Sequence, residues 1–203
     1  MTLAIAADVL IAAAWIGLAA DNLRLLRQER AARARLAPLP SRSLAASIVV
    51  LTVILGGIVV LETRTGGRLG FQPLAAIAGV VLAAAGLMLH ARARRALGVH
   101  WTSTVAVRPG HPIVRSGPYA VIRHPLYLGV LLLAAGTVLA HPSTATICVA
   151  AGLATGIALK IPAEERSLRA ACGDAWRNYV QSVPALVPRP SRVRAALLNR
   201  AAP

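Results

Sequence analysis

The chain has 203 residues, of which 57% are hydrophobic and only 14% are charged, and its mean hydropathy is +0.65. These values lie far outside the range of ordinary soluble domains. The formal net charge is +15, but the arginines are dispersed without interleaved aromatic residues, which argues against a nucleic-acid-binding surface. We therefore expect a single membrane domain whose basic residues contact anionic lipid headgroups.

Five apolar runs separate the charged segments. A helix needs roughly 20 residues to cross a hydrocarbon layer of about 30 Å. A soluble helix would also show a polar stripe, whereas the run Leu44–Leu61 carries no charge on any face. We predict an all-α integral membrane protein with about five transmembrane helices: Leu3–Ala20, Leu44–Leu61, Leu74–His90, Leu126–Ala140 and Thr144–Leu159. Only three residues separate the last two runs, so we interpret them as a tight helical hairpin.

The basic residues predict the orientation of these helices. Twenty of the 22 lysines and arginines fall in three segments on the same predicted side: 21–42, 91–125 and 160–203. By the positive-inside rule that side is cytoplasmic and the N-terminus lies outside. The near-exclusive use of arginine, with abundant alanine, favours a bacterial source and hence the plasma (inner) membrane. Residues 1–90 then form three spans, 91–188 a catalytic half and 189–203 a basic tail.

Motifs of soluble enzymes and metal sites are absent from the sequence. Cys148 and Cys172 have no Cys or His neighbour at ligand spacing, and the five histidines form no metal-binding pattern. No glycine-rich phosphate loop or nucleophile elbow occurs. We therefore expect no metal, and any chemistry must come from the segments beside the membrane.

The first such segment, from Arg115 to Gly129, reads R-S-G-P-Y-A-V-I-R-H-P-L-Y-L-G. Gly117-Pro118 predicts a turn, and Pro125 suits the first position of a helix, with His124 at its N-cap. The free N–H groups of such a helix start favour an anion, for example a carboxylate.

The second segment follows the fifth span, and we predict a cytoplasmic amphipathic helix that begins at Pro162. Its apolar stripe comprises Leu168, Cys172, Ala175, Tyr179 and Val183. Glu164 and Glu165 either cap this helix or pair with a cation at the bilayer surface, because placing an unpaired carboxylate there costs desolvation free energy. The hairpin returns them to the cytoplasmic side, close to His124.

Together these segments resemble the isoprenylcysteine carboxyl methyltransferase and phospholipid methyltransferase superfamily. The resemblance rests on R-H-P-x-Y-x-G from Arg123 to Gly129, the hairpin, and the Glu164-Glu165 pair. Further support comes from Leu97–Thr102, from H-P-I-V-R-S-G-P-Y ending at Tyr119, and from G-D-x-W-x-x-Y-x-x-x-V-P ending at Pro184. The similarity covers roughly residues 95–188.

This resemblance implies methyl transfer from S-adenosylmethionine to a lipophilic acceptor, with no metal. It implies cofactor-binding roles for His111, Gly117, Pro118, Tyr119, His124, Pro125, Tyr127, Glu164 and Glu165. It implies catalytic roles for Arg123, His124 and Glu165. An acceptor carboxylate would need only an orienting cation such as Arg123, whereas a phenol or pyrone hydroxyl would need His124 or a glutamate as base. Lipid amines and thiols also stay open as acceptors.

Two other functions fit parts of this pattern. Sterol-reductase-like membrane enzymes share much of the C-terminal signature and bind NADPH, so a lipid reductase is the main alternative. A non-enzymatic membrane scaffold is the other, but it leaves the clustered aromatic, histidine and glutamate residues unexplained.

Overall fold

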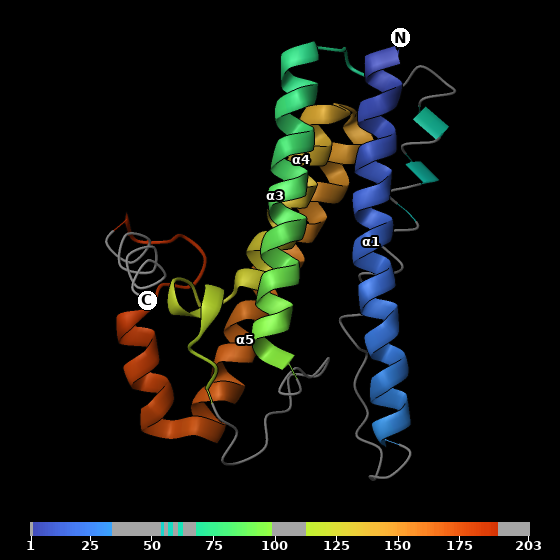
Figure 1. The fold of residues 1–203 in the computed structure, drawn as a ribbon. Coiled ribbons are helices and arrows are strands. Elements are labelled where there is room, and N and C mark those ends of the chain that lie inside the picture. The colour runs from blue at the N-terminus through green and yellow to red at the C-terminus, as the bar shows by residue number, and fades with distance from the viewer. Residues whose placement is uncertain are drawn as a thin grey trace, which may run out of the picture.

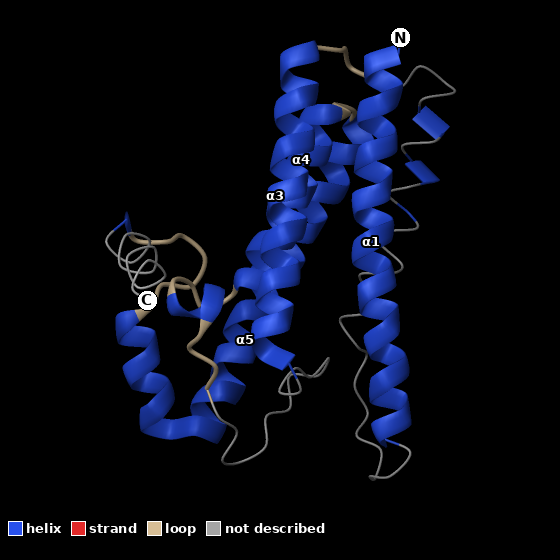
Figure 2. Cartoon of the chain, viewed as in Figure 1, coloured by secondary structure: helices blue, strands red, loops and turns tan. Residues whose placement is uncertain are grey.

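The computed structural model describes residues 2–33, 54, 57–58, 61–62, 68–98 and 113–190. Its described helices are α1 (Thr2–Arg33), α3 (Pro73–Leu97), η2 (Gly117–Ala120, a 3-10 helix), α4 (Pro125–Ala140) and α5 (Thr144–Ser182) (Figure 2). Three of them, α1, α3 and α5, are long and apolar enough to cross a membrane. The all-helical class and the membrane assignment are therefore confirmed. The predicted second span, Leu44–Leu61, lies largely outside the described residues, and a total of five spans stays a prediction.

The helices form an elongated bundle with two chemically different ends (Figure 1). At one end, here called the turn end, the N-terminus lies beside the link between α4 and α5, and the Leu69 amide donates to the Pro142 carbonyl oxygen (2.9 Å). At the other, the arginine end, α1 and α3 finish in basic residues and α4 begins. Arg94 on α3 lies 3.9 Å from Asp21 on α1 there. Helices α1, α3 and α5 therefore run from the turn end to the arginine end, and α4 runs the opposite way, as the hydropathy pattern predicts.

Small residues let α3 and α4 approach until their backbones touch. A Cβ added to Gly86 would lie 2.5 Å from the Gly129 carbonyl oxygen, and one added to Gly136 would lie 2.5 Å from the carbonyl oxygen of Gly79. Pairs of glycines spaced by seven residues thus face each other across the antiparallel interface. In a bilayer, where burial of apolar surface does not drive helix association, such close contact supplies the packing energy.

Helix α1 is attached to this pair by a buried polar contact. The Trp15 indole N–H donates to the Thr137 hydroxyl on α4 (2.9 Å), which itself donates to the Leu133 carbonyl oxygen. Around this contact lies the main apolar core, formed mostly by Ile11, Leu18, Ala83, Tyr127, Val130, Ala134, Leu153 and Ile157. Many other apolar side chains of the helices point outward, as expected for surfaces that contact lipid.

The hairpin prediction is confirmed, but the predicted helix start at Pro162 is wrong. Ser143 caps α5 through reciprocal hydrogen bonds with Thr146, and α5 then continues through Pro162 without ending. The chain turns at Gly173 instead, where φ is 51° and ψ is −122°, a conformation that glycine adopts without steric cost. Beyond this kink the helix doubles back toward η2 (Figure 1).

A charged cluster closes the turn end. His141, which is fully buried, lies with its Nδ1 3.1 Å from Asp8 and its Nε2 3.4 Å from Glu62. The Arg68 guanidinium pairs with Asp8 (3.2 Å) and also donates to the Ala140 carbonyl oxygen. These charges link α1, the segment before α3, and the turn after α4. Their mutual pairing offsets the cost of burying them.

Candidate functional site at the start of α4

Helix α4 begins as the sequence predicts, with His124 at the N-cap and Pro125 in the first turn. No side chain of the described residues caps this helix start, and the first N–H groups of a helix have no partner within it. Just before it, the amides of Arg123 and His124 donate to the carbonyl oxygens of Pro184 and Ala185, at 2.8 and 3.0 Å. The segment that follows α5 therefore holds the start of α4 in place.

The Arg123 side chain is buried and fully engaged. Its Nε and Nη2 donate to Oε1 of Glu165 at 3.0 and 2.8 Å, and its Nη1 donates to the carbonyl oxygens of Val180 and Val183. A guanidinium has three nitrogens, and all three have partners here. The predicted role of Arg123 in orienting the acceptor stays a prediction. The geometry favours a positioning role, because Arg123 links Glu165, before the Gly173 kink in α5, to Val180 and Val183 after it.

Both predicted glutamates lie next to the start of α4. Nε2 of His124 lies 3.1 Å from Oε1 of Glu165, and the Tyr127 hydroxyl donates to Oε2 of Glu164 at 2.6 Å. The rings of His124 and Tyr127 stack with their centroids 5.6 Å apart. All hydrogen bonds that described residues make to Glu165 arrive at Oε1, so Oε2 accepts none from them.

The turn at Gly117–Ala120, which precedes the start of α4, also lies at the site. Gly117 has φ of 59°, and Pro118 and Tyr119 follow it in η2. The Tyr119 ring is buried, and its carbonyl oxygen accepts the Tyr179 hydroxyl at 2.7 Å. Burial, and secondly the charge of Glu164, raise the pKa of the Tyr119 hydroxyl well above its usual value. That hydroxyl therefore keeps its proton at neutral pH.

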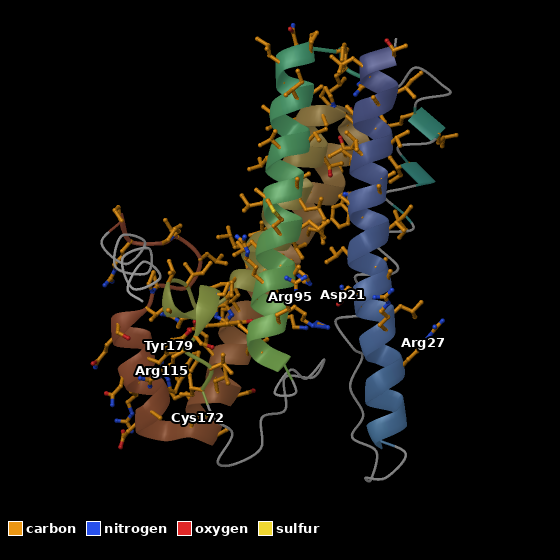
Figure 3. All side chains as sticks on the ribbon, viewed as in Figure 1. Asp21, Arg27, Arg95, Arg115, Cys172 and Tyr179 are labelled. Atoms are coloured by element: carbon orange, nitrogen blue, oxygen red, sulfur yellow. The ribbon has the colours of Figure 1, made fainter. Side chains whose placement is uncertain are left out.

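An aromatic cluster packs beside the site from the part of α5 that follows the Gly173 kink. Trp176, Tyr179 and Val183 pack together as a second buried core. The Arg115 guanidinium lies 5.5 Å from the centre of the Tyr179 ring and donates to the Ala175 carbonyl oxygen at 2.9 Å. Figure 3 shows Arg115 and Tyr179 together on this part of the molecule, with Cys172 nearby. Trp176 is thus a packing residue in the described structure.

Two residues of α3 next to the site were not predicted. His90 and Arg94 are buried on the face that α3 turns to the start of α4. The spacing of Gly79, Gly86, His90 and Ala93 along one helical stripe is a signal that would have placed them there. His111, by contrast, lies outside the described residues. The described residues hold no group of three or more His, Cys, Asp or Glu side chains arranged to bind a metal.

Residues 76–170 match the sequence model of the isoprenylcysteine carboxyl methyltransferase (ICMT) family. Over 114 residues the chain is 32% identical to protein-S-isoprenylcysteine O-methyltransferase B of Arabidopsis thaliana, covering 54% of this chain and 57% of the plant protein. Residues 76–170 are thus similar to the isoprenylcysteine carboxyl methyltransferase family. The resemblance inferred from the sequence is confirmed.

A second similar protein is named for metal resistance and not for methyl transfer. The chain is 37% identical over 98 residues to the cobalt-zinc-cadmium resistance protein CzcN of Cupriavidus metallidurans, covering 44% of this chain and 42% of that protein. The chain thus spans about half the length of the curated relatives it matches. The range of the family match begins in α3 and ends in α5. It includes the pairs Tyr127–Glu164 and His124–Glu165 but not the returning segment after Gly173.

Proposed function

We propose that this protein is an integral-membrane methyltransferase that uses S-adenosylmethionine and acts on a lipophilic acceptor at the arginine end of the bundle. The observation that carries the proposal is the convergence of Glu164 and Glu165 on the uncapped start of α4, beside His124 and Tyr127. By the positive-inside rule this end is cytoplasmic. The family match supports methyl transfer as the reaction class.

The residues present fit this donor. S-adenosylmethionine supplies a methyl group on a sulfonium, attached to a zwitterionic amino acid and an adenosine. Oε2 of Glu165, which accepts no hydrogen bond from the described residues, suits an ammonium group. The uncapped N–H groups at the start of α4 suit a carboxylate. Electron-rich faces of Tyr119 and Tyr127 suit a cation or a flat base.

Positioning is the main catalytic task that the chain performs in this proposal. Methyl transfer is an in-line displacement, so alignment of the two reactants and exclusion of water supply much of the rate. Arg123 and His124 hold Glu165 by three hydrogen bonds, and Tyr127 holds Glu164 by one. Both carboxylates are therefore oriented before a ligand arrives, which lowers the entropy lost on binding.

The depth of the site suits an acceptor that enters from the lipid. The start of α4 packs beside His90, seven residues before α3 ends at Leu97. At 1.5 Å per residue, the site lies about 10 Å below the end of α3. An acceptor with an apolar tail would then keep its tail in the hydrocarbon layer while its polar head reaches the site.

Titration of the detergent-purified protein with S-adenosylhomocysteine, the demethylated donor, tests the proposal. Glu165→Gln and His124→Ala should each weaken binding at least tenfold, because each removes a charged or hydrogen-bonding partner worth about 1.5–3 kcal/mol. Both variants should still insert into membranes, since neither changes an apolar span. Wild-type affinity in both variants would refute the site assignment.

A further inference from the structure

One ring nitrogen of His90 has a hydrogen-bond partner among the described residues. Its Nδ1 lies 3.3 Å from the Leu126 carbonyl oxygen in the first turn of α4. A carbonyl oxygen only accepts hydrogen bonds, so Nδ1 carries the hydrogen. In the neutral ring, Nε2 then presents a lone pair. The fold therefore fixes the tautomer of His90 and leaves Nε2 as a hydrogen-bond acceptor.

That lone pair is buried and unused within the described part of the chain. The His90 side chain is only 4% exposed, and Nε2 has no hydrogen-bond partner among the described residues. Buried polar atoms in folded proteins nearly always have a partner, and one that lacks it costs about 1–3 kcal/mol. A ligand that donates a hydrogen to Nε2 would remove this cost.

The surroundings of Nε2 place it beside the proposed methyl-donor site. His90 packs against Gly129 and contacts the Leu126 carbonyl oxygen in the first turns of α4. Tyr127 in the same turns donates to Glu164, so this side of α3 adjoins the glutamate pair. Figure 3 shows Asp21 on the neighbouring helix α1, at the level of the last turns of α3.

Arg94 lies one turn after His90 on the same stripe of α3, and its guanidinium lies 3.9 Å from the carboxylate of Asp21. A developing negative charge next to His90 would find this cation close by, in a setting where water is scarce.

We propose that His90 Nε2 receives the hydrogen of a hydroxyl or thiol on the lipophilic acceptor and takes its proton as that acceptor is methylated. This inference rests on the proposed methyltransferase function and narrows its substrate class. The acceptor oxygen or sulfur forms a bond to the methyl carbon, and the bond from that carbon to the donor sulfur breaks with its electron pair kept by sulfur. The proton passes to Nε2. A carboxylate acceptor brings no hydrogen and would leave Nε2 unpaired.

The test uses the full chain in lipid nanodiscs with two matched probes, 4-farnesylphenol and farnesylacetic acid. Two variants separate binding from proton transfer. His90→Asn puts an amide nitrogen where Nδ1 lies, keeping the bond to Leu126 while removing Nε2. His90→Gln puts an amide oxygen near Nε2, which accepts a hydrogen bond but takes no proton. His141→Gln, at the turn end, controls for loss of a buried histidine.

Three quantities are measured for each protein: the Kd of S-adenosylhomocysteine, the Kd of 4-farnesylphenol without donor, and kcat for methylation. The wild type should prefer the phenol over the acid at least tenfold in kcat/KM. Both His90 variants should keep the S-adenosylhomocysteine Kd within threefold and lose at least about 100-fold in kcat on the phenol, as expected for loss of a general base. His90→Gln, but not His90→Asn, should keep the phenol Kd. The His141→Gln control should match the wild type per folded molecule.

Other outcomes overturn the inference and are distinguishable from failure of the proposed function. A wild type that binds S-adenosylhomocysteine but methylates the acid in preference to the phenol refutes the role of His90 whether or not the variants fold. Unchanged kcat on the phenol in His90→Asn does the same. A wild type that fails to bind S-adenosylhomocysteine refutes the proposed function itself.

Discussion

The glycine contact between α3 and α4 gives the most quantitative prediction. In Gly86→Ala the new Cβ would lie 2.5 Å from the Gly129 carbonyl oxygen and 2.7 Å from the Leu133 nitrogen. Both are backbone atoms that cannot rotate away. To reach an ordinary contact of 3.4 Å the two helices must separate by about 0.9 Å, and a gap of that size costs a quarter to a half of each neighbouring contact.

Two opposing effects determine how much Gly86→Ala changes the free energy of unfolding. Overpacking costs about 1–3 kcal/mol, here near the upper end, while alanine gains about 1 kcal/mol in helix propensity over glycine. We therefore expect Gly86→Ala to destabilise the protein by about 2 kcal/mol. Gly152 on α5 is exposed, and a Cβ there meets no described neighbour within 4 Å. Gly152→Ala should thus be neutral or stabilise by up to about 1 kcal/mol.

Thermal unfolding in detergent distinguishes the two variants. A difference of about 2–3 kcal/mol corresponds to roughly 4–12 °C in Tm for a chain of this size. Gly86→Ala should also weaken S-adenosylhomocysteine binding, because Gly129 lies two residues after Tyr127 and any shift of α4 moves the site. Equal Tm values for the two variants would refute the close packing of α3 against α4.

The remaining predictions separate the two ends of the bundle. Tyr127→Phe removes the hydrogen bond to Glu164. We expect this variant to bind S-adenosylhomocysteine about 10- to 100-fold more weakly, since hydrogen bonds to charged groups contribute about 1.5–3 kcal/mol. An unchanged Kd in a calorimetric titration would contradict this expectation. Asp8→Asn removes the carboxylate that pairs with Arg68 and leaves His141 paired with Glu62 alone, and it should lower stability by about 3 kcal/mol with little effect on that Kd. A tenfold weaker Kd with an unchanged Tm would show that the turn end communicates with the site.

Local sequence signals predicted the start of α4, the hairpin and the first part of the site. Proline at the first helical position with a polar residue before it identified the start of α4. The three-residue link identified the hairpin. Because that link sends the chain back to the end it came from, the proximity of His124 to Glu165 also followed from the sequence. These features depend on neighbours in the chain or on the direction of chain reversal.

Contacts between distant segments could not be predicted in the same way. The rule that proline begins a helix placed a boundary at Pro162, yet α5 continues through it, as membrane helices often tolerate an interior proline. The pairing of Arg123 with Pro184 and Val183 depends on the kink at Gly173. The glycine spacing in α3 and α4 was visible in the sequence, but which faces meet is determined only by packing.

The central claim is that the start of α4 binds a methyl donor, and calorimetric titration of the wild-type protein with S-adenosylhomocysteine and, separately, with NADPH tests it most directly. We predict saturable binding of S-adenosylhomocysteine and no heat from NADPH. Binding of NADPH alone would contradict it and favour a lipid reductase, and binding of neither ligand would favour a non-enzymatic membrane protein.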